Sequence, residues 1–75
     1  MRPAATLAEQ RALLASGWRM DGLARADRQF GRERATIRTD GGWLLTDGTR
    51  SHWSQVGGGI LAAATAAESA ANGGE

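Results

Sequence analysis

Two Asp-Gly pairs, Asp40-Gly41 and Asp47-Gly48, divide residues 36–53 into three short runs rich in β-branched and aromatic residues. An Asp-Gly pair between apolar residues favours a hairpin, because Gly adopts positive φ at no steric cost and Asp bonds to its own backbone. Two such turns in succession predict a three-stranded meander. This is the strongest structural signal in the chain, and it requires a fold that contains an antiparallel sheet.

The lengths of the two turns predict how the strands pair. A three-residue loop at 40–42 would place Ile37 opposite Leu45, and a two-residue loop at 47–48 would place Trp43 opposite His52. One face of the sheet should then form the core, and it would carry Ala35, Ile37, Trp43 and Leu45. The other face would carry Arg34, Thr36, Arg38, Leu44, Thr46, Thr49, Ser51 and Trp53. A displacement of one residue would exchange the two faces.

Helix signals lie on both sides of the meander. Thr6 and Glu9 match a capping box, which predicts a helix over residues 7–16 that ends at Gly17. Residues 60–71 form an Ala-rich segment that ends at Asn72-Gly73, which predicts a second helix.

The segment between the first helix and the meander is harder to assign. Residues 18–20 alternate and lead into Asp21-Gly22, which predicts a short strand and another hairpin. Residues 23–30 suit a helix or a strand, and the hairpin before them favours a strand.

These elements predict one small α+β domain over residues 1–75, with an ordered core at about 6–71. The fold would be an antiparallel β-meander of about four strands with an N-terminal and a C-terminal helix, in the order α-β-β-β-β-α. The sequence leaves open which sheet face the C-terminal helix covers. If that helix covered the polar face, it would bury Leu44 and Trp53.

The residue types argue against an enzyme, a metal site and a cofactor. The chain contains no Cys and one His, so neither a thiolate site nor a His cluster can form. Residues 57–59 are all Gly, but they lack the Gly-Lys-Ser/Thr ending of a phosphate-binding loop and are expected to form a hinge. Most Asp residues adjoin turns, where Asp is a structural choice.

The charge of the chain is distinctive in the residue type that carries it, not in its amount. The net charge is +1, and all nine basic residues are Arg. A GC-rich coding sequence is the simplest cause, whereas the functional cause would be the planar guanidinium fork, which suits carboxylates and phosphates. Residues 25–38 carry five Arg against Asp27 and Glu33, so the basic charge is concentrated in the middle of the chain.

The polar sheet face is the candidate site for a partner. An exposed Trp beside Arg is a combination enriched at binding hot spots. The predicted partner-binding residues are Arg34, Arg38, Leu44, Arg50 and Trp53. They suggest a protein-binding module that acts as an inhibitor or regulator by covering a surface of a larger protein or protein complex. Small proteins of phages and mobile elements, including anti-CRISPR proteins, often have these general properties, although no motif matches a particular family.

Two other roles stay open. A nucleic-acid-binding accessory protein would use residues 25–38 against phosphates and Trp53 against a base. A homodimer would form through the Ala-rich helix or a free sheet edge. Neither a targeting signal nor a membrane-spanning stretch is recognised in the sequence, which predicts a cytoplasmic protein.

Overall fold

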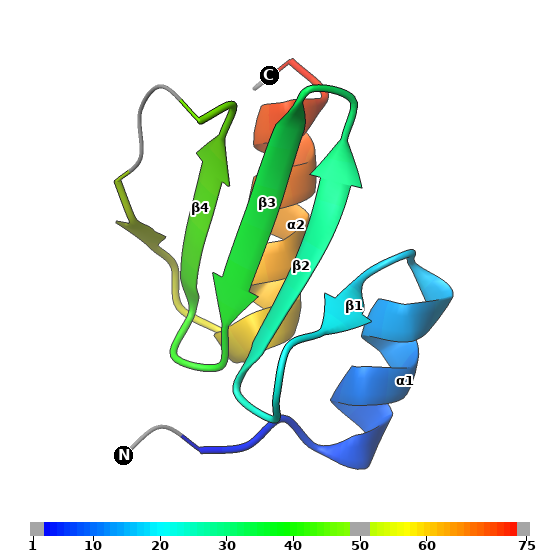
Figure 1. Cartoon of the computed structure of the whole chain (residues 1–75). Coiled ribbons are helices and arrows are strands. Elements are labelled where there is room, and N and C mark those ends of the chain that lie inside the picture. Colours follow the sequence, from blue (N-terminus) through cyan, green and yellow to red (C-terminus); the bar gives the residue numbers. More distant parts are fainter. Residues whose placement is uncertain (1–2, 49–51, 74–75) are drawn as a thin grey trace.

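The computed structural model describes residues 3–48 and 52–73. In chain order, this part contains α1 (Leu7–Ala15), β1 (Arg19–Met20), β2 (Arg25–Phe30), β3 (Glu33–Arg38), β4 (Gly42–Thr46), β5 (Ser54–Gln55) and α2 (Gly59–Ala71). The strands form one antiparallel sheet in the order β1-β2-β3-β4-β5. Helix α2 lies across one face of the sheet, and α1 lies beside β1 (Figure 1). The predicted α+β class is confirmed, with five strands where about four were expected.

Helix α1 begins as the sequence predicts. The Thr6 Oγ1 atom accepts the Glu9 N–H at 3.1 Å, and Glu9 Oε1 accepts the Thr6 N–H at 2.8 Å. Gly17 follows the helix with φ of 90°, which a residue with a side chain adopts only at a cost. The capping box therefore fixes the start of α1, and Gly17 turns the chain towards β1.

Residues 25–30 form a strand, as the hairpin context favoured. The Asp21 N–H donates to the Arg25 carbonyl at 2.8 Å and closes the turn between β1 and β2. A two-residue turn at Gly31 and Arg32 then joins β2 to β3, so that Phe30 pairs with Glu33.

The predicted strand register is wrong by two residues at both hairpins. Ile37 lies opposite Trp43 rather than Leu45, and Trp43 lies opposite Ser54 rather than His52. The register between β3 and β4 differs from the prediction because the turn between these two strands starts earlier than expected. The Gly41 N–H donates to the Arg38 carbonyl at 3.0 Å, and Asp40 Oδ1 accepts the Gly42 N–H at 2.9 Å.

The predicted faces nevertheless survive this change of register. Side chains alternate with a period of two along a strand, so a displacement of two residues leaves each one on its own face. Ala35 and Ile37 are fully buried, and Trp43 and Leu45 pack against the core. We call this the inner face of the sheet. Thr49 and Ser51, expected on the other face, lie outside the described residues.

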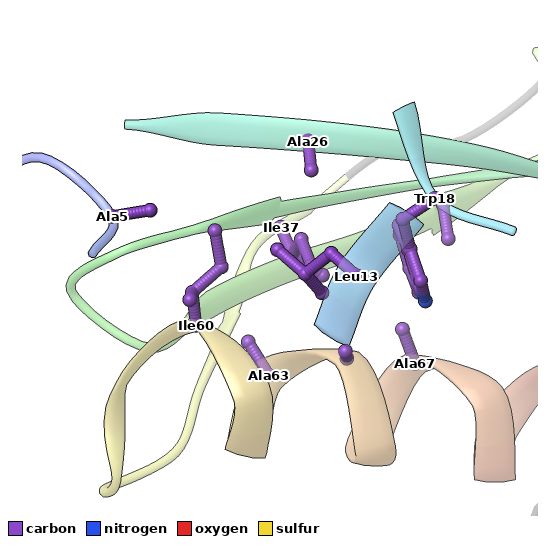
Figure 2. Packing of buried hydrophobic residues seen from close by; sticks show 10 residues of the cluster. Ala5, Leu13, Trp18, Ala26, Ile37, Ile60, Ala63 and Ala67 are labelled. Atoms are coloured by element: carbon purple, nitrogen blue, oxygen red, sulfur yellow. The ribbon is translucent and has the colours of Figure 1, made fainter. Parts of the chain in front are cut away.

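Helix α2 covers the inner face and completes the core. Figure 2 shows Ala63 and Ala67 of α2 directed towards the sheet, with Ala26 and Ile37 directed towards α2. All four of these side chains are fully buried. Leu13 and Trp18 close the core on the side of α1. The Ala-rich face of α2 is thus packed within the chain, against the inner face of the sheet.

The turn at Gly41 gives a first testable prediction. In Gly41→Ala, the new Cβ would collide with the Val56 carbonyl oxygen, and φ at this position is 91°. Gly22→Ala is the matched control, because Gly22 also follows an Asp at positive φ but has open space around it. We expect Gly22→Ala to lower the free energy of unfolding by about 1 kcal/mol and Gly41→Ala to lower it by clearly more. Urea denaturation measures both values, and equal losses would contradict this account.

The contact between α2 and the sheet gives a second prediction. Ala67→Leu adds volume to a fully buried position and should lower the free energy of unfolding by roughly 1–3 kcal/mol. Ser69→Leu adds the same side chain on the exposed side of α2 and should change it by less than about 0.5 kcal/mol. Thermal and urea denaturation of the two variants would distinguish them. A neutral Ala67→Leu would mean that α2 is not closely packed here.

Candidate functional site

The face of the sheet opposite α2, which we call the outer face, is not covered by either described helix (Figure 1). It carries the alternate residues of β2, β3 and β4, together with Arg19 of β1 and Trp53 just before β5. Its polar and charged members gather in two places, one at each end of β3. The outer face is therefore an open surface with two distinct clusters.

The first cluster, which we call the Arg–Trp cluster, consists of Arg25, Arg38 and Trp53. The Arg38 Cζ atom lies 4.0 Å from the centre of the Trp53 ring, and the Arg25 Cζ atom lies 5.6 Å from it. Arg25 and Arg38 are brought together because they are opposite each other in the pairing of β2 with β3. The electron-rich ring face attracts both guanidinium groups, each contact contributing about 0.5–1 kcal/mol at an exposed site.

Asp40 holds the Arg–Trp cluster in place from the turn after β3. Its Oδ1 atom lies 3.2 Å from Arg38 Nε, and the side chain of Arg38 is only 14% exposed. Trp53 remains 38% exposed. The cluster thus presents a large aromatic side chain at the surface, while a largely covered and ion-paired Arg fixes its orientation.

The second cluster, which we call the Arg–Asp cluster, consists of Arg19, Asp27 and Arg34. Asp27 is 8% exposed, and its two carboxylate oxygens face different arginines. Arg34 Nη2 lies 3.0 Å from Asp27 Oδ2, and Arg19 Nη2 lies 3.6 Å from Asp27 Oδ1. A nearly buried carboxylate requires such partners, so the two arginines are held against the sheet.

The structure places the four described partner-binding residues on the expected face but does not bring all of them together. Trp53 lies beside Arg38, as predicted. Arg34 lies four positions earlier on β3, roughly 13 Å away along the strand, and it pairs with Asp27 instead of approaching Trp53. Leu44 is half-buried on the outer face opposite Thr36. Arg50 lies outside the described residues.

Arg25 was not among the predicted partner-binding residues. The two-residue turn at Gly31 and Arg32 could have indicated its position, because that turn alone sets Arg25 opposite Arg38.

The sequence left open which face of the sheet the C-terminal helix covers, and the structure answers this. Because α2 covers the inner face, Leu44 and Trp53 are not buried beneath it.

The described residues offer little for metal or membrane chemistry. In residues 3–48 and 52–73, no group of three or more His, Cys, Asp or Glu side chains is placed to hold a metal ion. Neither described helix is long and apolar enough to cross a membrane. His52 is exposed.

The fold and the site together define a small α+β domain whose uncovered sheet face combines guanidinium groups with an exposed Trp. Comparison of the chain with protein-family models, with curated proteins and with solved structures finds no match. The function must therefore be argued from the two clusters themselves.

A double-mutant cycle tests the geometry of the Arg–Trp cluster. Arg38→Gln and Trp53→Leu should be coupled by about 0.5–1 kcal/mol in the free energy of unfolding, because each removes the same contact. The matched cycle of Arg34→Gln with Trp53→Leu should be additive within about 0.5 kcal/mol, since Arg34 lies at the far end of β3. Urea denaturation of the single and double variants gives both coupling energies. Equal coupling in the two cycles would contradict the placement of Trp53.

Proposed function

We propose that this protein is a non-enzymatic binding module that engages a larger protein through its outer sheet face. It would act as an inhibitor or regulator by covering a functional surface, as phage and mobile-element proteins such as anti-CRISPR proteins do. The proposed contact residues are Arg34, Arg38, Leu44, Arg50 and Trp53, with Arg25 added by its place in the Arg–Trp cluster. A cytoplasmic location forms part of this proposal.

The observation that carries the proposal is the fixed and exposed Trp53. Trp and Arg are the side chains most enriched at binding hot spots, where a few residues supply most of the binding energy. Binding normally costs the entropy of ordering surface side chains. Arg38 already lies over the Trp53 ring and is tied to Asp40, so part of that ordering is complete before a partner arrives.

The charge of the outer face indicates an acidic partner surface. Four arginines (Arg19, Arg25, Arg34 and Arg38) lie there, against Asp27 within the face and Asp40 at its end. Interfaces pair opposite potentials, which speeds association and excludes wrong partners. A partner that presents Asp and Glu side chains around an apolar recess for Trp53 would match this surface.

Nucleic-acid binding is the second candidate, favoured by the presence of guanidinium groups and an aromatic ring on an open sheet. Such sheets bind single strands by stacking bases on aromatic side chains. Here, however, Arg38 already lies over the Trp53 ring, and Arg19, Arg34 and Arg38 each face a carboxylate. Less of the Trp53 ring is then open for stacking with a base, and less positive charge is uncompensated for binding phosphates. A protein partner is therefore the better supported proposal.

Affinity capture tests the proposal. With the purified protein as bait in a lysate of its native host, Trp53→Ala and Arg38→Glu should each reduce recovery of the partner by about tenfold or more. Nuclease treatment should leave the recovery unchanged. Leu14→Ala and Arg11→Glu are matched controls, because they make the same kinds of change at exposed positions of α1.

Circular dichroism must show that the four variants keep the fold. Full recovery with both Trp53→Ala and Arg38→Glu would refute the site. Loss of the partner after nuclease treatment would instead favour the nucleic-acid candidate. In that case the double variant Arg34→Glu, Arg38→Glu should weaken binding of a short oligonucleotide at low salt.

A further inference from the structure

Arg25 and Arg38 place two positive charges directly opposite each other on the outer face, where β2 pairs with β3. The residues next to them are hydrogen-bonded, since the Thr39 N–H donates to the Ala24 carbonyl at 3.1 Å. In an antiparallel ladder such pairs alternate with non-hydrogen-bonded pairs, whose Cα atoms are only about 4.5 Å apart. Arg25 and Arg38 therefore form a close pair, and like charges in this position destabilise a sheet.

A carboxylate compensates one of these two charges. Asp40 Oδ1 lies 3.2 Å from Arg38 Nε, and the Arg38 side chain is 14% exposed. Arg25 makes no ion pair with a carboxylate of residues 3–48 and 52–73. Its side chain approaches the Trp53 ring instead, with Cζ 5.6 Å from the ring centre. Of the four arginines on the outer face, Arg25 is thus the one without a carboxylate partner in the described part of the chain.

The position of Arg25 favours the binding of a negative charge. Arg25 is half-buried, and the Trp53 ring that attracts it carries no net charge to neutralise it. The planar guanidinium fork has N–H groups that match the two oxygens of a carboxylate. A carboxylate from outside would form these hydrogen bonds and would also offset the repulsion between Arg25 and Arg38.

We propose that Arg25 selects the protein partner by binding an Asp or Glu side chain in an exposed acidic segment, while Trp53 contacts apolar residues beside it. This inference rests on the protein-binding function proposed above and adds the chemistry of the contact. One uncompensated Arg matches the single charge of a carboxylate. Affinity for a nucleic acid, by contrast, grows with the number of phosphates that are neutralised.

The free protein provides the first test. Arg25→Glu places a carboxylate opposite Arg38, whereas Arg25→Gln removes the charge without reversing it. We expect the urea midpoint of Arg25→Glu to exceed that of Arg25→Gln at low salt, and the difference to shrink at about 1 M NaCl because salt screens the charges. A midpoint of Arg25→Glu at or below that of Arg25→Gln would contradict the close pairing of residue 25 with Arg38.

Selection from a random peptide library displayed on phage tests the chemistry of the partner. With the wild-type protein as bait, peptides that combine Asp or Glu with large apolar residues should be enriched by about tenfold or more. Arg25→Gln should lose most of the preference for Asp and Glu, and Arg25→Glu should shift it to Arg and Lys. Arg11→Glu is the matched control, because it makes the same change at an exposed position of α1 and should keep the acidic preference.

The outcomes separate this inference from the proposed function. No acidic enrichment with the wild-type protein, or an acidic preference that persists in Arg25→Glu, would overturn the role of Arg25. In the lysate capture, a loss with Trp53→Ala but not with Arg25→Gln would keep the binding face and reject Arg25, whereas full recovery with both would reject the face itself. Binding of a mixed-sequence oligonucleotide that is lost in Arg25→Gln would assign Arg25 to phosphates instead. If circular dichroism shows that Arg25→Glu does not fold, Arg25→Gln decides.

Discussion

The close contact between α2 and the inner sheet face is the interaction on which the rest of this structure depends. Ala26 and Ala35 on the sheet meet Ala63 and Ala67 on the helix, and all four are fully buried. Small side chains allow the helix to approach the strands, so a chain of 75 residues can form a continuous core without disulfides. Because α2 occupies this face, the opposite face is left open.

A polar contact at the edge of the core fixes how α2 lies on the sheet. Glu68 accepts the Trp18 Nε1–H at 2.9 Å and lies 3.2 Å from Arg28 Nη1. Trp18 packs edge-on against Phe30, with ring centres 6.0 Å apart, and Arg28 lies over the Phe30 ring. One carboxylate of α2 therefore joins the helix both to β2 and to the residue just before β1.

Local signals in the sequence were sufficient to predict most helices and strands, whereas predicting how the strands pair needed long-range information. The capping box at Thr6 and the Ala-rich helix each depend on neighbouring residues, and both are found as predicted. The Asp-Gly pairs at 40–41 and 47–48 do follow strands with Gly at positive φ, but the loop lengths predicted for them are wrong, because β4 pairs with Ser54 and Gln55. The register failed because the turn at Asp40 starts at Arg38, which the dipeptide alone does not reveal. The faces were right because the error was an even number of residues. Arg25 was missed because the two-residue turn at Gly31 and Arg32, which sets it opposite Arg38, was not recognised in the sequence.

The two clusters of the outer face are stabilised by the same kind of contact. In each, a carboxylate holds an Arg against the sheet: Asp40 holds Arg38, and Asp27 holds Arg34. An Arg held in this way loses less entropy on binding than a free one, although part of its charge is already compensated. At one end the held Arg supports an aromatic ring, and the resulting surface suits a protein. At the other end Arg19 and Arg34 are both held by Asp27, and together they compensate the charge of that nearly buried carboxylate.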